Sequence, residues 1–272
     1  GVGGLFLYGV SNSADYSNAG IQGYLTGSAL GASFQTVNGN ILLNGSAQGQ
    51  GNGIEVSYAA LSASGGSITL TGASADEFYG IHSSHGTVSA SGSGSIEQIS
   101  LSGGIGLGTL TTSGTGNISV TSASSVERDA TTTQCGGNLS LTARGGEISD
   151  LGGALIVSGI TVLVAATENL LTFFNIHCDN VLNEFNDTVN LIGKNINLVA
   201  HTALELGSSE VRGDLSVEAE GAITQSGALS VAGAAELSAG NNDITLDNQG
   251  NDFNGTVSVL SGQDVRLRNS ED

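Results

Sequence analysis

Apolar and small polar residues alternate in short segments along the chain. Segments such as Leu229 to Val231 and Val265 to Leu267 place two apolar side chains on one side and a polar one on the other. Each segment is short and ends at Gly, Asn or Asp, the residues that tolerate tight corners between strands. The pattern predicts an all-β fold of short, half-buried strands joined by corners.

The return distance between these segments favours coiling over hairpins. The period is about 21 residues in three sets: Ile223, Ile244 and Val265; Ile118, Leu139 and Ile160; Leu215, Leu237 and Val257. A three-sided coil of this circumference brings each strand back onto its predecessor, about 4.8 Å further along the axis. We therefore predict a right-handed parallel β-helix in which the first set forms one interior column.

Longer self-similarity describes the organisation of the chain. Residues 183–191 return as residues 251–259, and residues 137–143 return as residues 213–219. Residues 40–54 return as residues 67–81, an offset of 27. We therefore expect one continuous β-helix over residues 1–272, with longer, glycine-rich coils in residues 1–136 and two copies of a three-coil unit in residues 137–272. The least regular stretch is predicted at about residues 165–184, as a loop or a short helical insertion.

Composition agrees with a coil that is hydrogen-bonded on both sides. The sequence has 43 glycines but no proline, methionine or tryptophan, and 39% of its residues are hydrophobic. That hydrophobic fraction can form a core, which a disordered glycine-rich linker could not. Absence of proline fits strands whose N–H groups all donate to a neighbouring coil.

Charge and hydropathy limit the partners. The sequence contains 6 Lys and Arg residues and 25 Asp and Glu residues, for a net charge of -19. Nucleic acids and anionic membrane surfaces require a basic footprint, so we exclude both as partners. No apolar run approaches the roughly 18 to 20 residues that span a bilayer, so membrane insertion is not expected. Since the chain starts at Gly1 without an export signal or an obvious cap, we expect flanking protein on both sides, or end-to-end self-association.

Three motifs resemble the repeats of filamentous haemagglutinin-like exoproteins. They occupy residues 40–45, 221–229 and 251–257, and the resemblance in repeat style extends over nearly the whole chain. It implies the shaft of a secreted or cell-surface bacterial fibre, exported by two-partner secretion or a related route. Such a fibre would serve adhesion or matrix building, on a glycan, host-cell or neighbouring-cell surface. The proline-containing signature of that family's secretion domain is absent.

The alternative is a β-helix that binds or degrades polysaccharide. A hydrolase needs two carboxylates across the scissile bond, and a lyase needs a basic residue. The first 127 residues contain no Lys or Arg. The densest titratable group consists of Asp76, Glu77, His82 and His85. Because charged residues in turns are mostly solvated, we interpret this group as an exposed corner, assign no catalytic residue and expect no enzymatic activity.

The two cysteines, Cys135 and Cys178, are too few for a disulfide framework. The irregular stretch before Cys178 could bring them within bonding distance, so a disulfide between them is one hypothesis and two separate buried thiols the other. A metal site at His177, Cys178 and Asp179 is disfavoured, because adjacent strand residues point to opposite faces.

No cofactor is predicted, with calcium as the one candidate. Acidic turns could gather this ion between coils, but the repetitive calcium-binding nonapeptide is absent. The turn residues concerned are Asp243, Asp247, Asp252 and Asp264.

Overall fold

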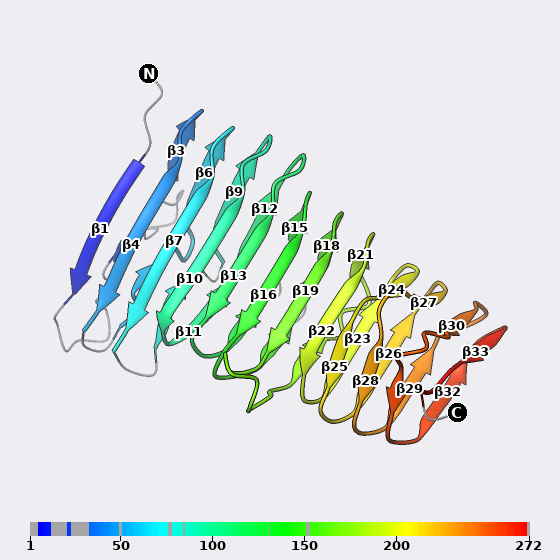
Figure 1. The fold of residues 1–272 in the computed structure, drawn as a ribbon. Coiled ribbons are helices and arrows are strands. Elements are labelled where there is room, and N and C mark those ends of the chain that lie inside the picture. The colour runs from blue at the N-terminus through cyan, green and yellow to red at the C-terminus, as the bar shows by residue number, and fades with distance from the viewer. Residues whose placement is uncertain are drawn as a thin grey trace.

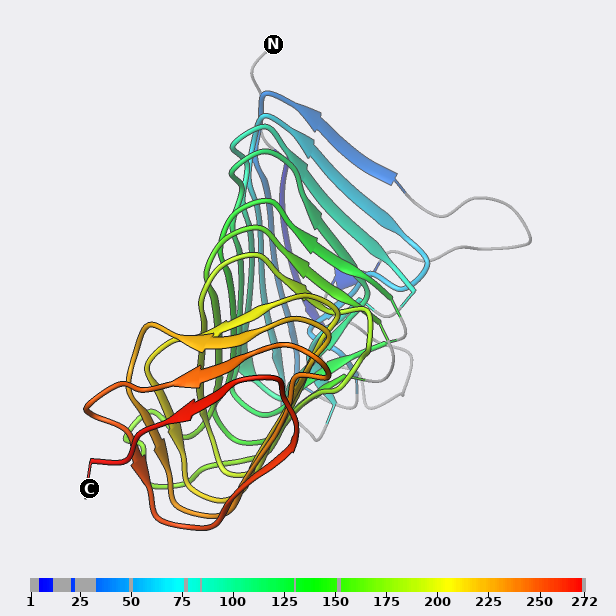
Figure 2. The ribbon, with the colours of Figure 1, turned by 90° about the vertical axis from the view of Figure 1, so that its right-hand side faces the viewer.

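The computed structural model is a right-handed parallel β-helix, as predicted (Figures 1 and 2). It describes residues 5–11, 21–22, 33–48, 51–75, 78–83, 85–129, 131–150 and 153–270. Over these ranges the chain forms strands, turns and loops without a helix, and so contains no helix long and apolar enough to cross a membrane. Every pairing between the named strands of the described ranges is parallel, so these strands do not pair as hairpins.

Three sheets, here called A, B and C, form the walls of the rod. Sheet A contains β1 (Leu5–Ser11), β4 (Ile41–Ala47), β7 (Ile68–Ser74), β10 (Ile96–Ser102), β13 (Ile118–Ser122), β16 (Leu139–Ala143), β19 (Thr161–Ala165), β22 (Val189–Gly193), β24 (Leu204–Leu206), β25 (Ser209–Val211), β27 (Ile223–Gln225), β28 (Leu229–Val231), β30 (Ile244–Leu246), β31 (Asp252–Phe253) and β33 (Val265–Leu267). Sheet B contains β2 (Ile21–Gln22), β5 (Ile54–Glu55), β8 (Tyr79–His82), β11 (Gly104–Leu107), β14 (Val126–Arg128), β17 (Ile148–Asp150), β20 (Ile176–Cys178), β23 (Ile196–Ala200), β26 (Leu215–Ala219), β29 (Ala235–Ser238) and β32 (Val257–Ser261). Sheet C contains β3 (Ser33–Val37), β6 (Ala60–Ser64), β9 (Thr87–Ser91), β12 (Thr109–Thr112), β15 (Thr133–Cys135), β18 (Leu155–Val157) and β21 (Glu184–Phe185).

Strand register confirms the predicted periods. Ile223 pairs with Ile244 and Ile244 with Val265, so these residues form one column. Ile41 pairs with Ile68, which is the longer offset of 27 residues.

Two of the three predicted sets contain one wrong member. Leu139 pairs with Thr161 instead of Ile160, whose side chain is 39% exposed. Leu215 pairs with Ala235 instead of Leu237. The reason is that corners differ in length by about one residue from coil to coil. A search at a fixed period of 21 residues therefore finds an apolar neighbour of the true inward residue when that residue is itself small or polar.

The wall arrangement changes at β22. Val189 at the start of this strand pairs with Leu206 of β24, whereas Ile192 near its end pairs with Glu210 of β25. One long strand is thereby continued by two short ones, and the later coils are built from sheet B and these paired short strands. In Figure 2 the yellow to red coils are accordingly turned relative to the blue and green ones.

A loop leaves the coil between β19 and β20, within the stretch predicted as least regular. An isolated antiparallel bridge between Ala166 and Phe173 closes its base. We call residues 166–173 the ledge. Leu170 and Leu171 at its tip are 43% and 79% exposed.

Side chains on sheet A form an apolar interior column with a single amide in it. The column contains Leu43, Leu70, Gln98, Val120, Leu141, Leu163 and Leu191. Gln98 is fully buried, and neither polar atom of its side chain has a hydrogen-bond partner. An unpaired buried amide costs free energy that a well-packed apolar side chain would not.

Replacing Gln98 by leucine is therefore expected to raise the free energy of unfolding of the surrounding coils by about 1 to 3 kcal/mol. Glutamate at the same position should destabilise them, because it would bury an unpaired charge. Urea unfolding of the three proteins tests this order. A leucine variant less stable than the wild type would mean that the amide is paired in solution.

Asparagine and serine side chains at the corners connect consecutive coils. Asn117 Oδ1 accepts a hydrogen bond from Asn138 N (2.8 Å), and Asn138 Oδ1 accepts one from Ile160 N (3.0 Å). The same bond, from the corner residue of one coil to the backbone of the next, recurs for Asn40, Ser67, Ser95, Asn175, Asn195, Asp214 and Asp243. These ladders explain why the corners are rich in short polar residues.

Candidate functional site

The outer face of sheet B carries a row of polar residues in register. Alternation turns Ile196 and Leu198 of β23 inward and Asn197 outward. Following the pairing from coil to coil places Glu55, His82, Gly106, Glu127, Ser149, His177, Asn197, Ser216, Glu236 and Ser258 in one line along the rod. We call this line the polar row.

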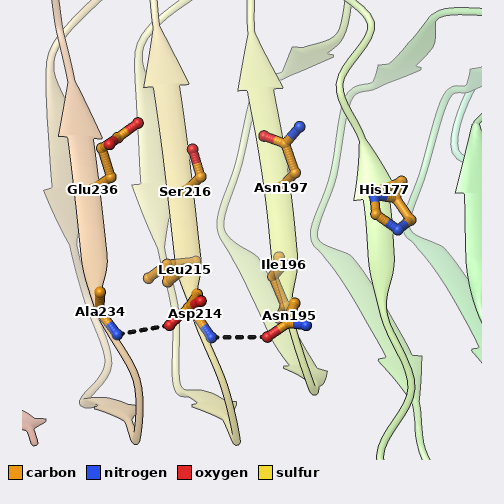
Figure 3. Close-up of a pocket in the computed structure, with 9 residues that line it drawn as sticks. All are labelled: His177, Asn195, Ile196, Asn197, Asp214, Leu215, Ser216, Ala234 and Glu236. Atoms are coloured by element: carbon orange, nitrogen blue, oxygen red, sulfur yellow. Dashed lines mark hydrogen bonds between the residues drawn. The ribbon is translucent and has the colours of Figure 1, made fainter. Parts of the chain in front are cut away.

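A groove of about 330 Å³ runs along the rod beside the polar row (Figure 3). His177, Asn197, Ser216 and Glu236 line one side, and Asn195, Asp214 and Ala234 line the other. Ile196 and Leu215, both buried, lie between the two sides.

The second side of the groove is held by a corner ladder. Asn195 Oδ1 accepts a hydrogen bond from Asp214 N (3.0 Å), and Asp214 Oδ1 accepts one from Ala234 N (2.9 Å; Figure 3). The groove therefore has hydrogen-bonding groups on both sides, with the carboxylates of Asp214 and Glu236 among them.

His177 lies at the N-terminal end of the groove. Its Nε2 atom is 4.0 Å from Glu147 Oε2, and Glu147 also accepts a hydrogen bond from Asn175 Nδ2 (2.7 Å). Cys178 is fully buried on the opposite face of the strand, so His177 and Cys178 do not converge on one ion.

Two of the four turn aspartates considered for calcium contact other groups. Asp243 Oδ1 accepts a hydrogen bond from Asp264 N (3.2 Å), and Asp247 lies 3.6 Å from Arg266 Nη1. Within the part of the chain that the structure describes, no group of three or more His, Cys, Asp and Glu residues could hold a metal ion.

Of the predicted titratable group, Asp76 and Glu77 lie outside the described residues. His82 is in the polar row, where its ring stacks on Tyr79 with centroids 4.9 Å apart. His85 lies at the following corner, stacked on Tyr58 and 3.8 Å from Asp129 Oδ2. The two histidines thus contact different partners.

Glu55, which sequence reasoning missed, is the residue that His82 contacts most closely. His82 Nδ1 is 3.0 Å from Glu55 Oε1 and 3.3 Å from Ser57 Oγ, and the Ser57 hydroxyl donates to Glu55. In a Ser-His-acid catalytic triad the serine and the acid contact opposite ring nitrogens. Here both face the same nitrogen, so the arrangement joins two coils and does not activate Ser57.

The Glu55 carboxylate is stabilised by its neighbours although it is buried. Burial raises its pKa, but the hydrogen bonds from His82, Ser57 and Asn52 together lower the pKa by more than burial raises it. The net result is a pKa below the ordinary 4.5. A carboxyl whose pKa is depressed on folding contributes stability above its unfolded pKa and loses it as the pH falls through the folded value.

Acidification below about pH 4.5 is therefore expected to lower the thermal midpoint of the wild type more than that of Glu55→Gln. Parallel melts between pH 3 and pH 6, with circular dichroism detection, measure the difference. Identical pH profiles would show that Glu55 does not contribute to acid sensitivity.

Of the two hypotheses for the cysteines, the structure agrees with two separate buried thiols. Cys135 and Cys178 are both buried, and no disulfide joins them. They lie on different walls, Cys135 in sheet C and Cys178 in sheet B, so the irregular loop does not bring them together. Cys135 Sγ instead donates to the carbonyl of Asn138 (3.2 Å).

These features define a solenoid repeat protein with a parallel β-helical core. A family model described as repeats of unknown function (DUF5649) matches residues 115–192 and 193–260, more than half of the chain. The chain belongs to this family. Comparison with curated proteins found no match. Comparison with solved structures found none either. The boundary between the two matched repeats, at residues 192 and 193, falls where β22 passes into the rearranged wall.

Proposed function

We propose that this chain is a shaft segment of a secreted or cell-surface bacterial fibre of the filamentous haemagglutinin-like type, used in adhesion or extracellular matrix building. The supporting observation is the uninterrupted axial stacking: sheets A and B pair strand on strand from the first coils to the last. Such a rod acts as a spacer, and its function depends on the domains or surfaces that it connects.

The C-terminal coil supports the proposal. Leu237, Ile244 and Leu246 are fully buried, whereas their partners one coil later, Val259, Val265 and Leu267, are 37%, 45% and 39% exposed. Exposed edge strands of a solenoid pair readily with another strand. We propose that a further coil, from the same long chain or from a second copy end to end, covers this face.

Immunogold labelling of intact bacteria with antibodies against this chain tests the location. Surface fibres should be labelled without permeabilisation. Label seen only after permeabilisation would contradict the proposal.

Glycan binding is the second candidate, favoured by the groove of Figure 3 with its amide, hydroxyl and carboxylate rims. Side chains of this kind hydrogen-bond sugar hydroxyls. We propose no catalysis, because the histidine–carboxylate contacts described above are structural. Retention of the purified chain on a glycan array, weakened by Asn197→Ala, would support this candidate, and release of reducing ends from a polysaccharide would show that an enzyme is present.

A further inference from the structure

The two family repeats contain the same series of strands. To within one residue, residues 115–192 contain β13 to β22 and residues 193–260 contain β23 to β32, ten strands each. Strand lengths in the first set are 5, 3, 3, 5, 3, 3, 5, 3, 2 and 5 residues. The second set repeats this order, with four residues instead of five in its seventh strand. We call the two sets the first and the second ten-strand unit.

The number of strands is kept although the number of residues is not. The ledge lies between β19 and β20 of the first unit, and the corresponding connection between β29 and β30 of the second unit is shorter. Corner contacts correspond as well. The hydrogen bond from Asn138 N to Asn117 Oδ1 in the first unit recurs as the one from Asp214 N to Asn195 Oδ1 in the second.

Ten strands do not make a whole number of three-strand coils. Each unit contains three coils and one further strand, so the second unit starts one wall later than the first. At the boundary, the five-residue strands β22 and β23 follow each other directly. The long strands therefore lie in sheet A in the first unit (β13, β16, β19 and β22) and in sheet B in the second (β23, β26, β29 and β32).

Equivalent surfaces of the two units consequently face different directions. Ser119 and Ser140 lie next to each other on the outer face of sheet A, and their counterparts in the second unit are Asn197 and Ser216 on the outer face of sheet B. The second pair lines the groove of Figure 3. In Figure 2 the coils of the second unit are turned relative to those of the first.

The described C-terminal strand continues the same order. β33 follows the five-residue strand β32, as β23 follows β22, and it pairs with β30 instead of a sheet B strand. Its backbone stays bonded to the preceding coil past its own end, because Arg268 N donates to Leu246 O (2.9 Å) and Ser270 N donates to Asn251 O (2.7 Å). β33 thus occupies the place of the first strand of a third unit, one wall further on.

We propose that the ten-strand unit is the building block of the shaft, and that each unit moves its long-strand face by one wall around the axis. Three units, or ten coils, then return this face to the same side after about 48 Å. The inference rests on the proposed shaft function and deepens it. A shaft built in this way presents equivalent faces on all its sides, which suits a fibre that contacts partners all around it in an extracellular matrix.

Crosslinking of engineered cysteine pairs in the purified whole chain tests the turn. Cys135 and Cys178 are 1% and 0% exposed, so a short thiol-to-thiol crosslinker reaches only the engineered pair in the folded protein. Asn197→Cys with Ser216→Cys should crosslink, because these residues are register partners about 4.8 Å apart. Ser119→Cys with Ser140→Cys, within the first unit, is the matched control for reactivity.

A third pair represents a rod without the turn. If the second unit continued the first on the same wall, the long strand β26 would lie on the long strand β22, and Ser216 would lie beside Asn190. Asn190→Cys with Ser216→Cys is therefore expected not to crosslink. Circular dichroism melts confirm that each variant is folded. Crosslinking of this third pair, or failure of the Asn197 and Ser216 pair while the control pair reacts, would overturn the inference.

Labelling of intact bacteria tests whether all sides of the fibre are presented. Ser140→Cys and Ser216→Cys are equivalent positions on different walls, and both side chains are half-buried. A membrane-impermeant maleimide-biotin should label the two variants within about twofold of each other, since exposure governs thiol reactivity. Labelling of one wall alone would overturn presentation on all sides. Absence of label on both would contradict the proposed surface location, whereas the crosslinks on the purified chain decide the turn independently.

Discussion

Replacing Leu246 by aspartate is expected to open the C-terminal coils, while aspartate at the neighbouring Thr245 should leave them closed. Leu246 is fully buried and pairs with Leu267, whereas Thr245 is partly exposed and pairs with Arg266 on the outer face. A carboxylate at position 246 would be desolvated in an apolar interior, at a cost of several kcal/mol unless it protonates. At position 245 it remains hydrated beside a basic residue.

Hydrogen exchange along the chain measures the outcome. In a solenoid each coil contacts only its neighbours, so protection should be lost around residues 237–267 and retained around residues 41–70. Uniform loss along the chain would indicate one cooperative unit. Equal sensitivity at positions 245 and 246 would contradict the strand register.

The repeat pattern was sufficient to predict the fold because the same physical requirement recurs in every coil. Inward positions must be apolar and corners must tolerate tight turns, so Ile223, Ile244 and Val265 identify a column without any structural knowledge. Errors arose where the requirement is met by a small or polar residue. Thr161 and Ala235 occupy inward positions beside the more apolar Ile160 and Leu237, and periodicity alone selects the latter.

Candidate site residues were harder to predict because they depend on contacts between coils. Glu55 was missed, although the 27-residue offset that aligns Ile54 with Ile81 also aligns Glu55 with His82. Applying the offset to polar positions would have found the pair. Arg128 is 1% exposed at an inward position of β14, where its Nη2 donates to the carbonyl of Ala154 (3.0 Å). Alternation from Val126 indicates that orientation, but burying a basic residue runs against its usual preference.

The ledge and the groove mark the limit of periodic reasoning. The repeat predicts where regularity fails, at about residues 165–184, but not that the inserted loop carries Leu171 into solvent. Likewise, one side of the groove is held by a hydrogen bond from Asp214 N to Asn195 Oδ1, a contact between coils that composition does not reveal.

Replacing Asn251 by alanine is expected to destabilise the last coils by about 3 kcal/mol, although the residue is polar and far from the groove. Asn251 is fully buried at the corner before β31. Its Oδ1 accepts hydrogen bonds from Leu229 N (3.0 Å) and Gln225 Nε2 (2.8 Å), and its Nδ2 donates to Leu246 O (3.0 Å). Alanine would leave a buried backbone N–H and a buried carbonyl without partners.

The same device occurs one repeat earlier, which makes the prediction testable twice. Asn183 is also fully buried; its Oδ1 accepts from Leu155 N (2.8 Å), and its Nδ2 donates to Cys178 O (3.1 Å). Both asparagines thus bond a carbonyl five residues earlier and an N–H of the preceding coil, as the 68-residue self-similarity requires.

Asn254→Ala is the matched control, since Asn254 is exposed and directly follows β31, whereas Asn251 directly precedes it. Urea unfolding should place Asn251→Ala and Asn183→Ala well below the wild type, and Asn254→Ala within about 0.5 kcal/mol of it. Hydrogen exchange should locate each loss in its own repeat, near residues 229–251 for one and residues 155–183 for the other. Equal stability of Asn251→Ala and Asn254→Ala would mean that water or a backbone shift replaces the buried amide, and that the corner asparagine does not lock the coils together.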